Sequence, residues 1–359
     1  MRNPFHGARV LVTGGCGFIG SNLVRRLVTL GAETTVVDNL AERCGGRREN
    51  LADVAGQIEL HHFDLVESAV HATLFRDRDF IFSIAGATSH IDSMRRPIAD
   101  LDGNCRAHLA LLETLRRVNP DGKIVVTGTR QVYGKPQRLP VDESHPLRPV
   151  DVNGIHMQAA ETYYRLYHEV YGLRSACLRL TNTYGPGMNL RNACHGFIAE
   201  FFRRALSGQE VELFGGGEQR RDINFVDDVV EAILSAAETG MREHEVYNLG
   251  HERHHSLREI AETLAEFNRF AIVHTPFPAE RRRIDVGDYW GSYDKFRRAT
   301  GWRPRTDLRQ GIERTTAFYR GRPAEYAGEQ VRSPGALAEA SHDVRTSFAS
   351  ANDATGAGS

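Results

Sequence analysis

A glycine-rich turn follows the first apolar run of the chain, and it constrains the fold more than any other feature. The run Val10–Val12 is followed by Gly14, Gly17 and Gly20. The turn leads into apolar residues at the spacing of one helix face, namely Ile19, Leu23, Leu27 and Leu30. A strand, a tight turn and a helix in this order let the backbone approach a pyrophosphate, whose oxygens then face the free N–H groups of the helix N-terminus. The segment therefore predicts a dinucleotide-binding turn.

Four further apolar runs alternate with helical patterns, at Thr34–Val37, Phe80–Ile84, Ile124–Val126 and Ala176–Leu180. Repeated strand–helix–strand units predict an α/β fold of the Rossmann type, a doubly wound parallel sheet with helices on both faces. A long helix ending near Gly172 is indicated by Ile155, Ala159, Thr162, Leu166 and Val170. Further along, Ser256 and Glu259 form a capping box that starts another helix.

The choice of cofactor rests on Asp38, which ends the second predicted strand. A carboxylate at this position accepts hydrogen bonds from the ribose hydroxyls of adenosine and repels a 2′-phosphate. The sequence therefore favours NAD over NADP.

The chain is long enough for one large domain and one smaller one. We expect an NAD-binding domain at 8–180 and a smaller C-terminal substrate domain at 181–320, with 222–250 returning to the first domain. From about residue 321 the composition shifts to Ala, Gly, Ser and charged residues without periodicity, which predicts a disordered tail to residue 359.

Composition and spacing argue against several classes of function. The formal net charge of −1 gives no basic surface for nucleic acid or an anionic membrane, and no apolar run approaches the length of a bilayer span. The five cysteines are scattered without a CxxC pair, which predicts reduced thiols and a cytoplasmic location rather than a disulfide framework or zinc site. Neighbouring histidines at 61–62 and 254–255 point apart, so no metal site is expected.

From about Ala8 to Tyr319 the chain resembles the extended short-chain dehydrogenase/reductase family, specifically its nucleotide-sugar epimerases and dehydratases. The resemblance is carried by Thr13-Gly-Gly-Cys-Gly-Phe-Ile-Gly20, Val37-Asp-Asn-Leu40, Asp64-Leu65, Ala85-Gly86, Pro97 with Asn104, Val132-Tyr-Gly134, Leu178-Arg-Leu-Thr-Asn182, Tyr184-Gly-Pro186, Arg220-Arg-Asp222, Val226-Asp-Asp228, Tyr247-Asn-Leu-Gly250 and Gly301-Trp302.

The resemblance implies binding roles for particular residues. The cofactor would contact Gly14, Gly17, Phe18, Ile19, Gly20, Asp38, Asn39, Asp64, Leu65, Ala85, Gly86 and Asn104. Asn182 would contact a nucleotide-diphosphate sugar, and Arg221 with Arg282 or Arg283 would hold its diphosphate, because a guanidinium fork matches phosphate oxygens.

The catalytic positions depart from the family pattern of a Ser or Thr, a Tyr and a Lys. Thr129 fills the first position, but the Tyr and Lys positions are implied to hold Asn153 and Met157. An amide exchanges no proton near neutral pH and a thioether has no charge. Arg130 and Gln131 stand where 4,6-dehydratases carry an acidic pair, which argues against 4,6-dehydration by the usual route.

Two histidines could replace the missing tyrosine as general base. His90 lies in the segment that would face the sugar, and His156 directly precedes Met157. A histidine side chain suits proton transfer in either direction near neutral pH. For each histidine a structural role, in packing or in positioning the substrate, remains the alternative.

These observations predict an NAD-dependent epimerase that oxidises a sugar hydroxyl transiently and returns the hydride to the other face. A non-catalytic protein that binds NAD or a sugar nucleotide is the first alternative, because Asn153 and Met157 replace the family Tyr and Lys. A net oxidoreductase or a decarboxylase on the same substrate class is the second. The helices near Cys105–Val118 and Asn153–Tyr171 resemble those that pair two subunits in this family, which implies a homodimer.

Overall fold

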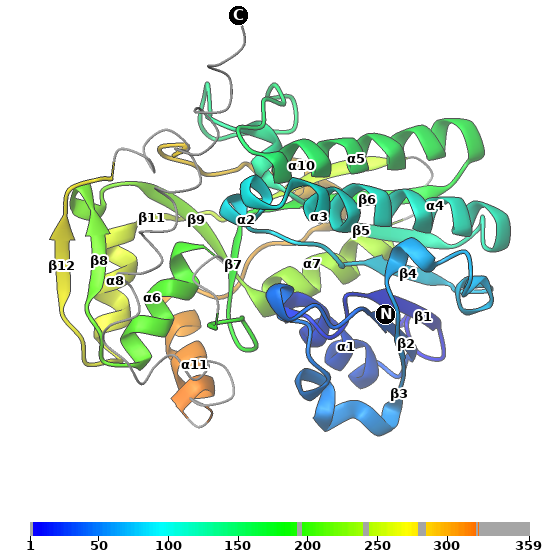
Figure 1. The fold of residues 1–359 in the computed structure, drawn as a ribbon, viewed down its shortest axis with the longest axis horizontal. Helices are drawn as coiled ribbons and strands as arrows, with labels where there is room; N and C mark the ends of the chain where they lie inside the picture. Colours follow the sequence, from blue (N-terminus) through cyan, green and yellow to red (C-terminus); the bar gives the residue numbers. More distant parts are fainter. Residues whose placement is uncertain (1–2, 192–195, 240–243, 279–284, 321, 323–359) are drawn as a thin grey trace, which may run out of the picture.

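The computed structural model describes residues 3–191, 196–239, 244–278, 285–320 and 322. A seven-stranded parallel sheet lies on one side, and smaller sheets with their own helices lie on the other (Figure 1). The order in the large sheet is β10-β6-β5-β4-β1-β2-β3. In chain order its strands are β1 (Arg9–Thr13), β2 (Glu33–Asp38), β3 (Ile58–His62), β4 (Phe80–Ser83), β5 (Lys123–Thr129), β6 (Arg174–Leu180) and β10 (Glu245–Leu249). The predicted doubly wound α/β fold is confirmed.

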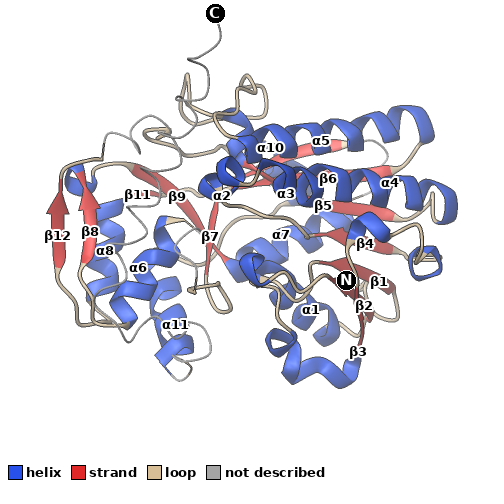
Figure 2. Cartoon of the chain, viewed as in Figure 1, coloured by secondary structure: helices blue, strands red, loops and turns tan. Residues whose placement is uncertain are grey.

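Helices cover both faces of this sheet. Successive side chains of each strand point to opposite faces, so a strand contributes to the core on each side. Val10 and Val12 of β1 belong to the core on the side of α1 and α7, whereas Leu11 belongs to the core under α4 and α5 (Figure 2). The helices of this part are α1 (Phe18–Thr29), α2 (His90–Arg95), α3 (Pro97–Leu101), α4 (Ala107–Val118), α5 (Val152–Tyr171), α7 (Val226–Glu238) and α10 (Asp294–Thr300), and a π-helical turn at Asp102–Arg106 joins α3 to α4.

The strand order places the predicted cofactor turn at a switch point of the sheet. β1 lies between β2 and β4, so the chain winds outward from β1 in one direction and then from β4 in the other. Open parallel sheets bind their ligands at such a point, beyond the carboxyl ends of the strands. The segments that follow β1 and β4 therefore meet there.

The smaller part is built on two short sheets with a separate core. One sheet has the order β11-β9-β7 and the other pairs β12 with β8. Their apolar side chains pack with those of three helices (Figure 1). The elements are β7 (Asn182–Tyr184), α6 (Phe197–Leu206), β8 (Val211–Phe214), β9 (Arg220–Phe225), β11 (His254–Ser256), α8 (Leu257–Ala265), β12 (Ile272–Thr275) and α11 (Leu308–Arg320).

Two helix boundaries agree with the sequence. α5 ends at Gly172, whose φ of 73° is the left-handed conformation that glycine adopts easily. The capping box of Ser256 and Glu259 starts α8. No helix within the described ranges has the length and apolar character that crossing a bilayer requires.

Candidate active site

The glycine turn after β1 has no room for side chains. Gly14 has a φ of +70°, and a Cβ built on it would lie 2.6 Å from the Cα of Ala85. A Cβ on Gly20 would collide with the carbonyl oxygen of Gly14. Gly17 starts α1 without a side-chain cap, so the first N–H groups of the helix stay open to a ligand. This cradle fits the pyrophosphate of a dinucleotide.

Asp38 also braces the turn. Its Oδ2 accepts a hydrogen bond from the Cys16 N–H at 2.9 Å, and its Oδ1 accepts one from the Leu40 N–H at 2.8 Å. Burial raises the pKa of this carboxyl, although the two N–H groups counteract the effect. Next to it, Asn39 donates to Asp64 at 2.8 Å, so two predicted cofactor contacts hold each other. Nothing in the sequence indicated that Asp38 would also hold the turn in this way.

Asn104 shapes the loop after β4. Its side chain is fully buried, and its Oδ1 accepts a hydrogen bond from the Ala87 N–H at 2.8 Å. A Cβ on Gly86 would lie 2.9 Å from that same oxygen. Asn104 thus holds the backbone around Gly86 in place. Among the other predicted cofactor residues, Leu65 is buried and Ala85 is packed beside the same apolar cluster. Phe18 and Ile19 are partly buried against other apolar clusters.

Asn153 belongs to a buried polar cluster centred on Asp100. Its Nδ2 donates to the Ala87 carbonyl at 2.7 Å and to Asp100 Oδ2 at 3.1 Å. Asn104 donates to the same carboxylate at 3.0 Å, and His156 Nδ1 lies 2.7 Å from its other oxygen. The His156 side chain is only 15% exposed. Asn153 and His156 therefore tie α5 to α3.

Met157 lies in a small apolar cluster. It is 9% exposed and packs with Val132, Tyr133, Val141 and Tyr289. A lysine here would put its ammonium group among apolar side chains, at a high desolvation cost. At this position methionine therefore acts as a packing residue.

His90 and Asp151 form a pair that the sequence did not reveal. Asp151 caps α5 by accepting the Gly154 N–H at 2.7 Å, and its other oxygen is hydrogen-bonded to His90 Nδ1. The carboxylate is nearly inaccessible, whereas the His90 side chain is 38% exposed. Burial alone would raise the pKa of Asp151, but the hydrogen bond and charge of His90 outweigh it, so the pKa lies below its usual value. Because a carboxylate only accepts, the neutral form of the ring would carry its proton on Nδ1, which leaves Nε2 as its acceptor atom.

The residues after β5 lie beside this pair. Thr129 caps the following turn by accepting the Gln131 N–H at 3.2 Å. The Gln131 side chain donates to the Thr88 carbonyl at 3.2 Å, two residues before His90. Its buried Oε1 has no hydrogen-bond partner within the part of the chain that the structure describes. The Arg130 guanidinium stacks on the Tyr289 ring at 4.6 Å. Thr129 and Gln131 thus place polar groups beyond the carboxyl end of β5, near the segment that leads into His90.

On the substrate side, Asn182 and Arg221 are placed differently. The buried Nδ2 of Asn182 has no hydrogen-bond partner among the described residues, as expected of a group that contacts a ligand. Arg221 is 6% exposed, donates to the carbonyls of Arg220 and Gly287 and lies 3.5 Å from Asp285. Burial, followed by the charge of Arg130, lowers the pKa of Arg221 to about 10. Arg282 and Arg283 lie outside the described residues.

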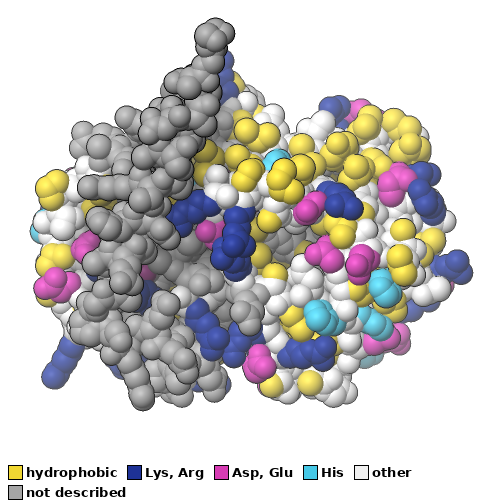
Figure 3. Space-filling view, in the orientation of Figure 1, with side chains coloured by type: hydrophobic (Ala, Val, Ile, Leu, Met, Phe, Trp, Pro, Cys, Tyr) yellow, Lys and Arg dark blue, Asp and Glu magenta, His cyan; other side chains and the backbone are white. Residues whose placement is uncertain are grey.

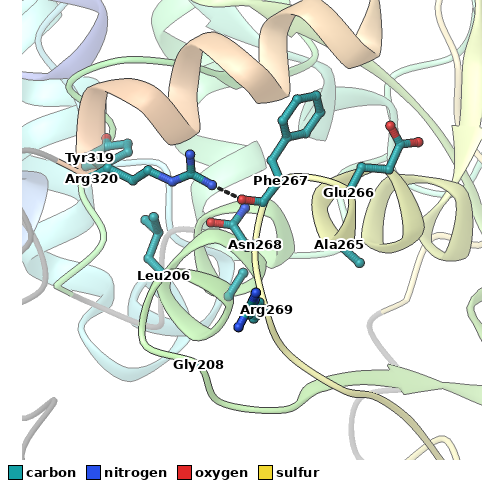
Figure 4. A pocket seen from close by; sticks show the side chains of 10 residues that line it. Leu206, Gly208, Ala265, Glu266, Phe267, Asn268, Arg269, Tyr319 and Arg320 are labelled. Carbon is teal, nitrogen blue, oxygen red and sulfur yellow. Dashed lines mark hydrogen bonds between the residues drawn. The ribbon is translucent and has the colours of Figure 1, made fainter.

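A pocket of about 750 Å³ lies elsewhere, between α6, α8 and α11 (Figure 4). At its rim Arg320 donates to the carbonyl oxygen of Phe267. Leu206, Asn268 and Tyr319 are among its lining residues, and none of the predicted site residues lines it. The pocket is therefore separate from the glycine turn.

The sequence profile of the NAD dependent epimerase/dehydratase family matches residues 10–250. The chain belongs to this family. The expected NAD cofactor and enzyme class are confirmed by this match, and the glycine cradle fits the cofactor. The non-standard residues at the family Tyr and Lys positions are not tested by it.

Relatives in this family carry out more than one reaction. A UDP-glucose 4-epimerase of Mycolicibacterium smegmatis is 31% identical over 321 residues, which cover 87% of this chain and 98% of that protein. UDP-glucuronic acid decarboxylase 1 of Xenopus tropicalis is 27% identical over 87% of this chain and 72% of its own length. The crystal structure of UDP-glucose 4-epimerase from Thermotoga maritima with UDP-glucose superposes with a TM-score of 0.79 at 31% identity, covering 87% of this chain and 99% of that one.

Proposed function

We propose that this protein is an NAD-dependent epimerase of a UDP-linked sugar. The single observation that carries the proposal is the open Nε2 of His90, whose Nδ1 is held by the buried Asp151 beside the cofactor loop. The amide of Asn182, which has no partner among the described residues, and the buried cation of Arg221 support a sugar-nucleotide site at β7 and β9 of the smaller part. The similarity to UDP-glucose 4-epimerases supports the uridine nucleotide.

The chain's own residues supply binding and proton transfer in this proposal. Bound NAD would supply the hydride-accepting and hydride-returning chemistry. His90 Nε2 takes the proton of the reacting hydroxyl, while Asp151 fixes the ring and stabilises its protonated form. Thr129 positions that hydroxyl from the end of β5. The role that the family gives to tyrosine thus moves from α5 to the start of α2.

One observation favours the non-catalytic alternative. Asn153 and Met157 are both fully engaged, one in the Asp100 cluster and one in an apolar cluster, and neither is available to a substrate. If His90 does not act as the base, the protein binds NAD and a sugar nucleotide without turnover. A decarboxylase is the further candidate, because one of the similar proteins is a UDP-glucuronic acid decarboxylase.

The deciding experiment identifies the ligands first and the turnover second. Native mass spectrometry of the purified protein identifies retained ligands. Incubation with UDP-glucose, UDP-galactose, UDP-N-acetylglucosamine and UDP-glucuronate then tests for epimers or carbon dioxide.

We expect an epimer, and we expect His90→Gln to lower the rate of its formation by about 10²–10⁴, the usual contribution of a general base. The control is His156→Gln, since His156 is bonded to Asp100. Full activity in His90→Gln would refute the proposed base, and binding without turnover in wild type would favour the alternative.

We also propose that the protein is a homodimer that pairs through α5. The apolar stripe used to predict this helix faces outward, with Ile155, Leu166 and Val170 exposed by 53%, 44% and 59%. Figure 3 shows hydrophobic side chains gathered on the side of α2, α3 and α5, where Met94 and Ile98 are also exposed. A contiguous exposed apolar surface of this kind is typical of a subunit interface. The cytoplasmic location and the division into two domains stay predictions.

A further inference from the structure

Arg130 has no acidic ion-pair partner among the residues that the structure describes, although it lies in the candidate site. Its guanidinium stacks on the Tyr289 ring at 4.6 Å, and no carboxylate of the described residues lies within ion-pair distance of it. Tyr289 is 2% exposed and bridges to Arg221 of β9. A guanidinium that lies over an aromatic ring still has N–H groups that can bind an anion.

The carboxylates near Arg130 are already committed to other groups. Asp151 binds His90 and the Gly154 N–H. Asp222 accepts from the Thr181 hydroxyl at 2.5 Å and from the Gly291 N–H at 2.9 Å. On the other side, Asp285 faces Arg221 and accepts from Gln219.

The charge of Arg130 acts on residues of both α5 and β9, which indicates that Arg130 lies between these two elements. Its charge is among the influences that lower the pKa of Asp151 on α5, and it also acts on the buried Asp222 of β9. It adds to the burial that lowers the pKa of Arg221. Arg130 and Arg221 thus repel each other. The carboxylates that act on Arg221, which are Asp222, Asp285 and Asp288, each accept hydrogen bonds from other groups.

A negative group on the reacting sugar can best supply the anion that Arg130 would bind. Arg130 directly follows Thr129 at the end of β5, and the next residue, Gln131, is hydrogen-bonded to the segment that leads into His90. Arg130 therefore lies between the His90 side of the site and Arg221, which lies on β9 of the smaller part. An anion beside the proposed base belongs to the sugar rather than to the diphosphate.

We propose that Arg130 is a specificity residue that pairs with a carboxylate of the reacting sugar, and that the substrate is a nucleotide-linked uronic acid. The inference rests on the proposed function and names its substrate class. The planar fork of Arg130 can take both carboxylate oxygens, which a hydroxymethyl group in the same place would not satisfy. A neutral hexose leaves the cation without a counter-charge.

The test measures affinity rather than turnover, by calorimetry on the NAD-loaded protein. The ligands are UDP, UDP-glucose and UDP-galactose, with UDP-glucuronate and UDP-galacturonate as the acidic counterparts. We expect wild type to bind the uronates about ten- to a hundredfold more tightly than the neutral sugars, as charge-assisted hydrogen bonds give. Arg130→Gln should lose this preference while its affinity for UDP and NAD stays unchanged. Arg130→Lys keeps the charge without the fork and should retain part of the preference.

The matched control is Arg165→Gln, which removes an equal charge from the exposed face of α5, where Arg165 pairs with Glu169. It should keep the full preference. Wild-type protein that binds UDP but does not distinguish uronates from neutral sugars would overturn the inference. So would an Arg130→Gln variant that weakens UDP as much as it weakens the uronates, because Arg130 would then contact the diphosphate. Failure of wild type to bind UDP or any UDP-sugar would refute the proposed function itself.

Discussion

The buried carboxylate of Asp151 holds the His90 ring while it caps the helix that follows. One oxygen accepts the Gly154 N–H at 2.7 Å and the other is bonded to His90 Nδ1. A single side chain thus sets both the start of α5 and the direction of the proposed base.

We predict that Asp151→Asn separates these two roles. Asparagine is a good helix cap, so stability should change little, but a neutral amide no longer stabilises the charge that forms on the ring during proton transfer. We expect kcat to fall by up to about 10²-fold, the lower range for a general base. In contrast, Asp151→Ala should also lose about 0.5–2 kcal/mol of stability with the cap. An Asp151→Asn variant with the parent's rate would remove Asp151 from the mechanism.

We predict that NAD binds at least about tenfold more tightly than NADP, because the charge of Asp38 opposes a 2′-phosphate. Asp38→Asn should reduce this ratio and also weaken NAD. An amide offers one acceptor oxygen, whereas Asp38 accepts from both Cys16 and Leu40. Calorimetric titration with both cofactors measures this, with the exposed Asp53→Asn as control. Equal affinities in wild type would show that Asp38 only braces the turn.

We predict that Arg221→Ala weakens UDP-sugar binding by about 1.5–3 kcal/mol, the scale of a charge-assisted hydrogen bond. Burial lowers the pKa of Arg221 to about 10, and a bound diphosphate would add negative charge to that of Asp285 beside this cation. NAD affinity should stay the same. The control is Arg258→Ala, an exposed arginine paired with Glu218. An unchanged dissociation constant for the UDP-sugar would place the diphosphate elsewhere.

We predict that Val170→Glu converts a dimer into a monomer, because it puts a charge in the apolar stripe of α5. Light scattering at micromolar concentration measures the mass. Val70→Glu is the matched control, since Val70 is 82% exposed but lies away from this helix. A monomeric wild type, or a Val170→Glu variant that stays dimeric, would contradict the interface.

We predict that restoring the family tyrosine by Asn153→Tyr destabilises the protein instead of activating it. Asn153 is 1% exposed and donates to Asp100 and Ala87. The larger ring would overpack this space and remove those donors, at a cost of about 1–3 kcal/mol for each effect. Thermal unfolding measures the loss. An increase in turnover without loss of stability would show that the position still faces the substrate.

The sequence predicted the elements whose signals are local. The glycine turn, the apolar strands and the cap at Ser256 each depend on residues close together in the chain. The contacts of His90 and Asn153 depend on residues 61 and 53 positions away, so no spacing rule could reveal them. The stripe of α5 shows a second limit. Periodicity located the helix, but an apolar face turned toward a partner has the same pattern as one turned toward the core.

The collision that a side chain at Gly20 would make with the Gly14 carbonyl has an evolutionary consequence. Because backbone fills the space there, no single substitution leads away from the dinucleotide turn without breaking it. Positions 153 and 157 are closed to single changes for a different reason, since their side chains are buried in the Asp100 cluster and in an apolar cluster. Descendants of this chain can therefore regain the family tyrosine and lysine only together with changes in the residues packed around them, while the cofactor turn is held by backbone alone.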